Sequence, residues 1–289
     1  MKRTFLLLCA VALLALGTFS CNRRSKSELL YRRAESAFQA KEYQRAQRII
    51  DSIPTGGFYS SEWSHKGIIL NQRITLEENR RNLAYIDSLL PPLYKIRKAL
   101  LPMFRYVQDS LYQDEGYYLY CNDKEADDLR HPSLRVQITP DYKGEIVSIY
   151  YGEKPLRHMS AKVELADGTY ALTPTIAYDD ALSYSFRFPD GYYSELVTYT
   201  GRELRPIFEL ISSSGEQPVK ISYEGDFPYS YMLSENDREA FKKSYQLIAL
   251  QKHISNIEEE KEATEKIIEL LIQQLSDHED DPLSSKNKE

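Results

Sequence analysis

The stretch LEENRRNLAYIDSLLPPLYKIRKALLPMFRYVQDSL (residues 76–111) decides the fold, because it carries an almost unbroken heptad seam. Nine of the eleven seam residues are apolar, and they step by three and four: Leu76, Asn79, Leu83, Ile86, Leu90, Leu93, Arg97, Leu100, Phe104, Val107 and Leu111. This spacing is typical of a helix whose narrow apolar stripe packs on a second helix. We therefore predict a first rod helix over residues 61–112.

Prolines interrupt this predicted helix at Pro91-Pro92 and at Pro102. A proline has no backbone N–H and crowds the preceding turn. We expect the helix to break or kink after Leu90 and again before Met103, which favours a segmented rod.

The carboxy-terminal segment carries a matching seam. Ser234 followed by Asp237 resembles a capping box, which predicts a helix over residues 234–277. The seam residues are Leu247, Leu250, Ile254, Ile257, Lys261, Thr264, Ile268, Leu271 and Leu275. We predict that the two helices pack antiparallel, with the numbers of facing residues summing to about 346, which places Ile86 near Ile257. A homo-oligomer, in which each heptad helix pairs with its copy, is the alternative.

Residues 113–233 read as a Tyr-rich β domain inserted between the two helices. Six segments alternate or are rich in β-branched and aromatic residues: 134–138, 145–151, 160–165, 184–188, 193–199 and 219–223. Asp167-Gly168 and Asp190-Gly191 are the signal of tight hairpins, which favours an antiparallel sheet. Residues 201–212 are expected to form one helix that covers the sheet with Leu204, Ile207, Phe208 and Ile211.

Residues 28–57 read as a helical hairpin, since apolar residues follow helical spacing on both sides of residues 41–43. Ala34, Tyr43 and Ala46 make it resemble a single tetratricopeptide unit. No second copy follows, and such repeats need neighbours to bury their faces. The hairpin is therefore expected to cap the adjoining helices. No peptide groove is inferred from the resemblance.

Residues 1–20 have the features of a secretory signal peptide. Lys2 and Arg3 form a positive start, residues 5–19 are uncharged and mostly apolar, and the segment is short for a membrane span. Its end, Thr18-Phe19-Ser20-Cys21, resembles the lipobox of bacterial lipoproteins, although that motif prefers Leu and a small residue where Thr18 and Phe19 stand. The resemblance implies acylation of Cys21, with palmitate among the acyl groups and residues 21–27 as a lipidated tether. It covers these 21 residues alone.

Cysteine usage supports the same interpretation. Cleavage would remove Cys9, which leaves Cys21 and Cys121 in an oxidising compartment. If Cys21 is acylated, Cys121 remains, and it is expected to be a small buried strand residue. A Cys21–Cys121 disulfide is the competing interpretation.

Charge and tether composition give the expected location. Removal of Lys2 and Arg3 with the signal peptide takes the formal net charge from −6 to −8, which argues against nucleic-acid binding. By analogy with lipoproteins, Asn22 after the cysteine suits transfer to an outer membrane, and the basic residues 23–26 favour the periplasmic face over the cell surface. The polar tail 278–289 is expected to be disordered.

Candidate ligand contacts come from tyrosine. Sixteen of the 23 Tyr lie between Tyr112 and Tyr231, and Tyr rings on a sheet can stack on sugars or hold a peptide. The candidate contact residues are Tyr150, Tyr151, Tyr184, Tyr192 and Tyr193. Strand alternation gives a simpler alternative, in which one ring of each Tyr-Tyr pair enters the core and the other faces water.

Catalysis has little support in the sequence. Asp127-Asp128, Asp179-Asp180 and Glu195 are acidic candidates for hydrolysis, but adjacent strand residues point to opposite faces. The histidines are isolated: His65, His131, His158, His253 and His278. We therefore assign no catalytic residue, no metal site and no cofactor.

These observations predict an α+β chain with an N-terminal helical hairpin and long antiparallel coiled-coil helices that flank the inserted β domain. The expected function is a membrane-anchored envelope lipoprotein with a non-catalytic structural or protein-binding role. A glycan- or peptide-binding lipoprotein that uses the Tyr-rich face is the alternative, and an envelope hydrolase is the third. The expected partners are the membrane and another envelope protein or cell-wall glycan.

Overall fold

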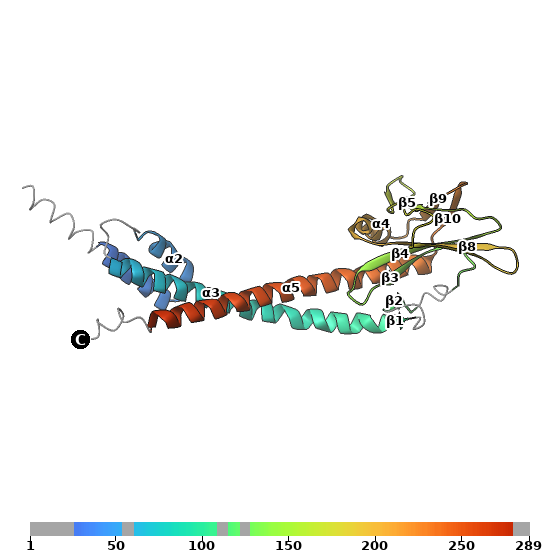
Figure 1. Cartoon of the computed structure of the whole chain (residues 1–289). Helices are drawn as coiled ribbons and strands as arrows, with labels where there is room; N and C mark the ends of the chain where they lie inside the picture. Colours follow the sequence, from blue (N-terminus) through green and yellow to red (C-terminus); the bar gives the residue numbers. More distant parts are fainter. Residues whose placement is uncertain (1–25, 54–60, 109–114, 122–127, 280–289) are drawn as a thin grey trace, which may run out of the picture. The chain divides into compact units, whose positions relative to one another are not determined.

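The computed structural model describes residues 26–53, 61–108, 115–121 and 128–279 (Figure 1). It confirms the α+β class, with long helices before and after a β domain that contains two antiparallel sheets. The chain divides into two compact units. The first comprises residues 1–89 and 257–289, and the second comprises residues 90–256.

The first unit begins with a helical pair, a helix over residues 26–39 and α2 (Tyr43–Asp51). Lys41 adopts a positive φ of 60° in the turn between them. The pair packs on α3 (Ser61–Leu100), which supplies Leu70 and Ile74 to a shared core. The other buried residues of this core come from the pair and the turn after it: Ala34, Ala37, Tyr43, Ala46, Ile50 and Ile53.

Within the first unit, α3 runs antiparallel to the end of α5 (Glu235–Glu279). The side chains of Gln72 and Gln274 are hydrogen-bonded at 3.1 Å, and Asp87 pairs with Lys261 at 2.7 Å. The residue numbers of these two pairs sum to 346 and 348, which agrees with the expected sum of about 346. The α5 seam from 257 to 275 is buried or half-buried at every predicted position, whereas its neighbours Ile267, Leu270 and Ile272 are exposed.

Of the two outcomes predicted at Pro91-Pro92, a break or a kink, the break is wrong, because α3 continues through both prolines to Leu100. Both residues are exposed. The carbonyls of Asp87 and Ser88, which lose their N–H donors, therefore lie on the side of the helix that water can reach. Packing of the opposite face keeps the helix continuous.

The predicted first rod helix also extends too far, since residues 104–107 form a strand and not the end of a helix. Pro102 lies in a short 3₁₀ turn (Leu101–Met103), and β1 (Phe104–Val107) follows it. In a strand, residues three apart point to opposite faces. Phe104 accordingly packs in a core with Tyr120. Leu111 lies outside the described residues.

The second unit contains two antiparallel sheets. The six-stranded sheet has the order β1-β2-β3-β4-β8-β7, and the four-stranded sheet has the order β10-β9-β5-β6. The remaining strands are β2 (Tyr117–Tyr120), β3 (Ser133–Ile138), β4 (Gly144–Gly152), β5 (Ser160–Leu165), β6 (Tyr170–Leu172), β7 (Ser183–Arg187), β8 (Tyr193–Tyr199), β9 (Val219–Glu224) and β10 (Tyr229–Met232). The six predicted strands are present, and β2 lies next to Cys121, where a strand was also expected. The short strands β1, β6 and β10 were not predicted.

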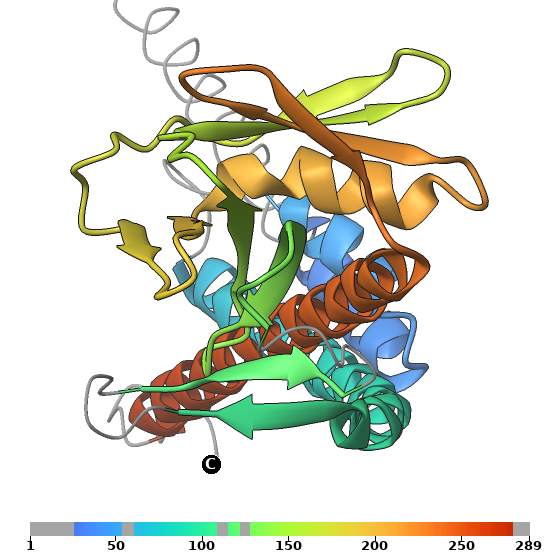
Figure 2. The same ribbon diagram turned by 90° about the vertical axis from the view of Figure 1, so that its right-hand side faces the viewer.

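The main core of the second unit lies between the sheets and α4 (Arg205–Ser213), which follows a 3₁₀ turn (Arg202–Leu204) (Figure 2). The four predicted helix residues Leu204, Ile207, Phe208 and Ile211 are all buried there. Hairpins form at both Asp-Gly pairs, where Gly168 and Gly191 have φ of 86° and 95°. These positive values favour glycine.

Two local predictions at the ends of elements have different outcomes. The Ser234 hydroxyl accepts a hydrogen bond from the Asp237 N–H at 3.0 Å, so Ser234 caps α5 as predicted. Cys121, by contrast, is exposed and follows β2 in a turn, where its N–H donates to the Met103 carbonyl at 2.8 Å. The expectation of a buried strand residue was wrong because β2 ends one residue earlier. Cys21 lies outside the described residues.

None of the described helices combines the length and the apolar character that a bilayer crossing requires.

Candidate functional site

Five aromatic rings form a continuous cluster at the β7 edge of the six-stranded sheet. We call Tyr151, Tyr184, Phe186, Phe188 and Tyr192 the aromatic surface. Adjacent ring centroids are 5.7 Å apart for Tyr184 and Phe186 and 4.8 Å apart for Phe186 and Phe188. Phe188 lies 5.9 Å from Tyr151, which stacks on Tyr192 at 5.1 Å with an interplanar angle of 15°. Tyr184 is 64 % exposed and the other four rings are half-buried.

The strand register produces this surface. Tyr184 and Phe186 are two residues apart on β7, so they share a face, and Phe186 pairs across the sheet with Ser194. Ser194 in turn pairs with Tyr151 on β4. The turn at Asp190-Gly191 then brings Tyr192 beside Tyr151. Rings from two strands, β4 and β7, and from the β7–β8 hairpin therefore meet on one side of the sheet.

Charged groups border the aromatic surface. The Arg130 guanidinium lies 4.5 Å from the centre of the Phe188 ring and 3.4 Å from the Asp190 carboxylate. The Tyr192 hydroxyl donates a hydrogen bond to Glu153 at 3.4 Å. Burial of the ring, and then the Asp190 charge, raise the pKa of Tyr151, so its hydroxyl stays protonated and can donate at neutral pH. The surface thus combines apolar ring faces with polar groups at its border.

A buried hydroxyl that no described residue satisfies lies within this surface. Ser194 is 0 % exposed, and its Oγ forms no hydrogen bond with the residues that the structure describes. Its cross-strand neighbours are Tyr151 and Phe186. A buried unsatisfied polar group costs about 1–3 kcal/mol. The hydroxyl that carries this cost lies at the centre of the aromatic surface.

The structure brings three of the five tyrosines named from the sequence together, namely Tyr151, Tyr184 and Tyr192. Tyr150 lies in the core on the opposite face, where its hydroxyl donates to the Lys154 carbonyl at 2.8 Å. Burial raises the pKa of Tyr150 to about 12. Tyr193 pairs with Gly152 and faces away from Tyr151 as well. The Tyr150-Tyr151 pair therefore follows the simpler alternation.

Sequence reasoning missed Phe186, Phe188, Arg130 and Ser194. The first two could have been found, because the alternation Tyr184-Ser185-Phe186-Arg187-Phe188 places three rings on one face. Arg130 and Ser194 gave no local signal, since their roles depend on strands that are distant in sequence.

A second candidate is a buried hydrogen-bonded trio in the order serine, histidine, glutamate. Ser148 Oγ lies 2.7 Å from His158 Nε2, and His158 Nδ1 lies 3.1 Å from Glu195 Oε2. This is the connectivity of a nucleophile, a base and an acid that orients the base. Glu195 also accepts hydrogen bonds from the backbone N–H groups of Arg157 and His158.

The trio is closed to solvent, since Ser148 and His158 are 0 % exposed and Glu195 is 2 % exposed. Tyr199 lies 3.2 Å from Ser148 Oγ and extends the chain of hydrogen bonds. Burial raises the pKa of Glu195, but the hydrogen bonds from His158 and the Arg157 N–H outweigh burial and bring that pKa below its ordinary value. The arrangement satisfies buried polar groups between the two sheets and gives a substrate no route to Ser148.

The other titratable candidates stay apart. Asp128 accepts a hydrogen bond from the Arg130 N–H, and Asp180 accepts one from the Leu182 N–H, both at 2.9 Å in exposed turns. Asp127 lies outside the described residues. His65 and His278 do meet, with ring centroids 5.2 Å apart. Among the described residues, no three His, Cys, Asp or Glu side chains gather in a group that could hold a metal ion.

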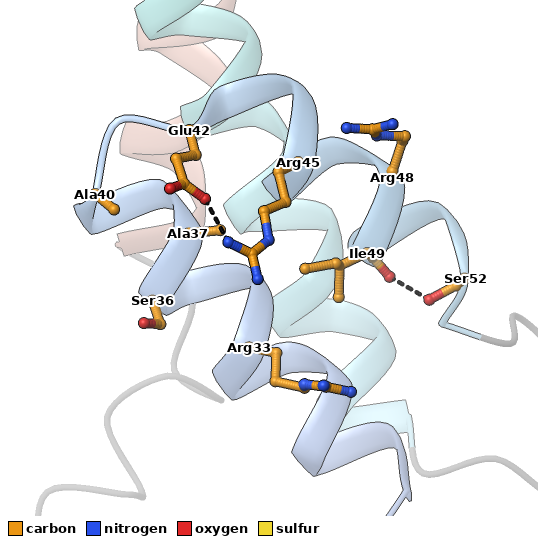
Figure 3. Close-up of a pocket in the computed structure, with 9 residues that line it drawn as sticks. All are labelled: Arg33, Ser36, Ala37, Ala40, Glu42, Arg45, Arg48, Ile49 and Ser52. Carbon is orange, nitrogen blue, oxygen red and sulfur yellow. Dashed lines mark hydrogen bonds and ion pairs between the residues drawn. The ribbon is translucent and has the colours of Figure 1, made fainter.

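A third candidate is a basic hollow between helix 26–39 and α2 in the first unit, with a volume of about 520 Å³ (Figure 3). We call it the arginine hollow. Its lining residues are Arg33, Ser36, Ala37, Ala40, Glu42, Arg45, Arg48, Ile49 and Ser52. Figure 3 shows Arg45 extending from α2 toward the helix that carries Arg33, with Glu42 beside it. None of these arginines was predicted from the sequence to be a site residue.

Comparison of the chain with family models, with curated proteins and with solved structures finds no match.

Proposed function

We propose that this chain is a lipid-anchored protein of the bacterial envelope that binds another envelope protein, without catalysis, through the aromatic surface of its second unit. The observation that carries the binding role is the cluster of five partly exposed rings at the β7 edge of the six-stranded sheet. The location follows from the signal sequence and from Cys21 at its end. We place the anchor in an outer membrane, on the periplasmic side.

The edge strand β7 favours an extended protein segment as the bound partner. The Thr198 N–H bonds to the Leu182 carbonyl before β7, and the Phe188 N–H bonds to the Tyr192 carbonyl after it. Even-numbered residues of β7 therefore bond to β8, and the backbone groups of Ser185 and Arg187 face the open edge. A partner strand could bond there while its side chains cover the rings.

The size of the apolar surface suits such binding. Complete burial of one aromatic side chain is worth about 1.5–3 kcal/mol. The rings are already partly covered by one another, so each contributes a fraction of that value. Several rings together still supply a useful part of the free energy that association requires.

A glycan is the second candidate ligand. Tyr151 and Tyr192 stack in parallel and present ring faces with hydroxyls, and Glu153 and Asp190 stand close by. Ring faces pack against the apolar face of a sugar, and carboxylates accept hydrogen bonds from its hydroxyl groups.

Site-specific photocrosslinking in the native cell tests the proposal. A photoreactive phenylalanine analogue at Tyr184 should give a discrete adduct with one envelope protein. Tyr170, which is 58 % exposed on β6 of the other sheet, provides the matched control position. A Phe186→Ala change should remove the adduct at position 184.

The same adducts at both positions would contradict a specific site at β7. An adduct with cell-wall glycan at Tyr184 alone would select the second candidate. Release of the wild-type protein into the soluble envelope fraction would contradict the anchor and leave the binding role intact.

A further inference from the structure

The arginine hollow concentrates positive charge on an acidic chain. The lining of the hollow contains three arginines and one carboxylate, that of Glu42. An adjoining hollow shares Glu42, Arg45 and Arg48, and it adds Lys41 and Arg81 against Glu78. The formal net charge of the whole chain is −6. The local excess of basic residues therefore opposes the overall charge.

The guanidinium groups of the arginine hollow have N–H donors that their contacts with described residues do not use. Arg45 is held by Glu42 at 2.7 Å through one nitrogen, Nη1. Arg48 donates from Nε to the Gln44 carbonyl at 3.3 Å, and within the described part of the chain neither Arg48 nor Arg33 forms an ion pair. Ala37 and Ala40 are small, which leaves room between the helices. A planar guanidinium with free N–H groups suits the oxygens of a phosphate group.

The hollow lies close to Cys21 along the chain, which favours a lipid headgroup as the source of the phosphate. Lys26, the first residue of helix 26–39, follows Cys21 by five positions, and an extended chain covers at most about 18 Å over that distance. Arg33 lies seven residues further, about 10 Å along the helix. If Cys21 carries the lipid, Arg33 is held within about 28 Å of the anchored sulfur. The hollow then meets headgroup phosphates at a high effective concentration.

We propose that the arginine hollow binds the phosphate of an anionic lipid headgroup in the membrane to which Cys21 is anchored. This inference rests on the lipid anchor of the proposed function. It adds a second, electrostatic contact between the first unit and the bilayer. Free phosphate shares the chemistry, so the test must distinguish the two sources.

Vesicle binding of the acyl-free mature chain provides the test. The protein is residues 21–289 with Cys21→Ser, which retains every residue that the structure describes. Vesicles contain phosphatidylcholine alone or with phosphatidylglycerol, at low and constant ionic strength. We expect partition onto phosphatidylglycerol vesicles, and the triple variant Arg33→Gln/Arg45→Gln/Arg48→Gln should weaken it on the order of 100-fold, since each basic residue near an anionic surface contributes about fivefold.

A control variant removes the same charge elsewhere. Arg202→Gln/Lys220→Gln/Lys242→Gln changes three exposed basic residues of the second unit. It should partition as the parent chain does. Equal losses in the two triple variants would overturn the proposal, because net charge would then explain the binding.

Competition with inorganic phosphate separates the two sources. Replacement of chloride by millimolar phosphate at the same ionic strength should leave vesicle binding unchanged. Displacement by phosphate would overturn the headgroup assignment in favour of a soluble anion. Equal partition onto both kinds of vesicle would overturn it as well. Because the chain carries no acyl group, none of these outcomes depends on whether Cys21 is lipidated.

Discussion

Lys261 Nζ of α5 lies 2.7 Å from Asp87 Oδ1 of α3, and this pair marks the antiparallel register of the two helices in the first unit. Both side chains are partly exposed, so the ion pair itself contributes at most about 1 kcal/mol. The apolar seam beside it supplies the stability. Ile86, Ile257 and Leu271 are each at most 8 % exposed.

Leu271→Asp should therefore destabilise the first unit strongly. The change puts a charge in a buried seam position, and we expect the free energy of unfolding to fall by at least about 3 kcal/mol. Ile257→Asp should act in the same direction. Chemical unfolding followed by circular dichroism measures both losses.

Leu270→Asp is the matched control, because Leu270 is the neighbouring residue and is 54 % exposed. Its effect should stay within about 0.5 kcal/mol. Similar losses for the two leucines would mean that the stripe on α5 does not face α3.

His158→Ala should destabilise the second unit by about 3–5 kcal/mol, since the buried Glu195 carboxylate loses its side-chain partner and keeps only backbone N–H donors. Thermal unfolding checks this loss. His253→Ala, at an exposed position of α5, should leave the midpoint unchanged. A stable His158→Ala protein would show that the buried trio is dispensable for the fold.

Lowering the pH should remove the contribution of Glu195 to the free energy of unfolding. The folded pKa of Glu195 lies below its ordinary value, so the stabilisation is complete above the ordinary carboxyl range and is lost as the pH falls through the lowered value. The difference in unfolding free energy between wild type and Glu195→Gln should be largest at neutral pH. It should shrink below about pH 4. A difference that grows on acidification would give the pKa shift the opposite sign.

Acylation of Cys21 should be visible in the intact mass of protein purified from its native membrane. We expect a mature chain that begins at Cys21 and carries added fatty mass. Cys21→Ser should abolish the added mass and release the protein from membranes, because the hydrocarbon provides the anchor. A mature chain that starts at another residue would contradict the lipobox resemblance.

Tyr150 and Tyr184 should respond differently to truncation, although both were candidate ligand contacts. Tyr150→Ala removes a buried ring and should cost about 3–5 kcal/mol of stability. Tyr184→Ala removes a ring that is 64 % exposed and should change stability by about 0.5 kcal/mol or less. Thermal melts of the two variants measure this contrast. Equal losses would place Tyr184 in the core.

The long helices were predictable because their signal is local and repeats. Each seam residue of α5 from Leu247 to Leu275 follows the last by three or four positions, and a helix turns such spacing into one face. Asp167-Gly168 and Asp190-Gly191 also act locally. The end of α3 was missed because Phe104 and Val107 continue the three-and-four spacing, while Pro102 and pairing with β2 place them in a strand.

The sites were less predictable, because they depend on strand pairing. Ser148, His158 and Glu195 come from three segments, and Glu195 is 37 residues from His158. No local pattern relates them. Tyr151 and Phe186 meet only through the register of β4, β8 and β7. The arginine hollow needs the turn at Lys41, whose positive φ is not encoded by a glycine.

The discontinuity of the first unit affects how the chain folds during synthesis. Gln72 and Gln274 are 202 residues apart, so the apolar stripe of α3 emerges long before its partner. At about 5–20 residues per second, the delay is on the order of 10–40 s. During that interval Leu76 and Ile86 have no α5 to cover them. A chaperone that binds exposed apolar helices would protect this chain throughout translation. Loss of the last turns of α5 would leave the apolar stripe of α3 exposed permanently.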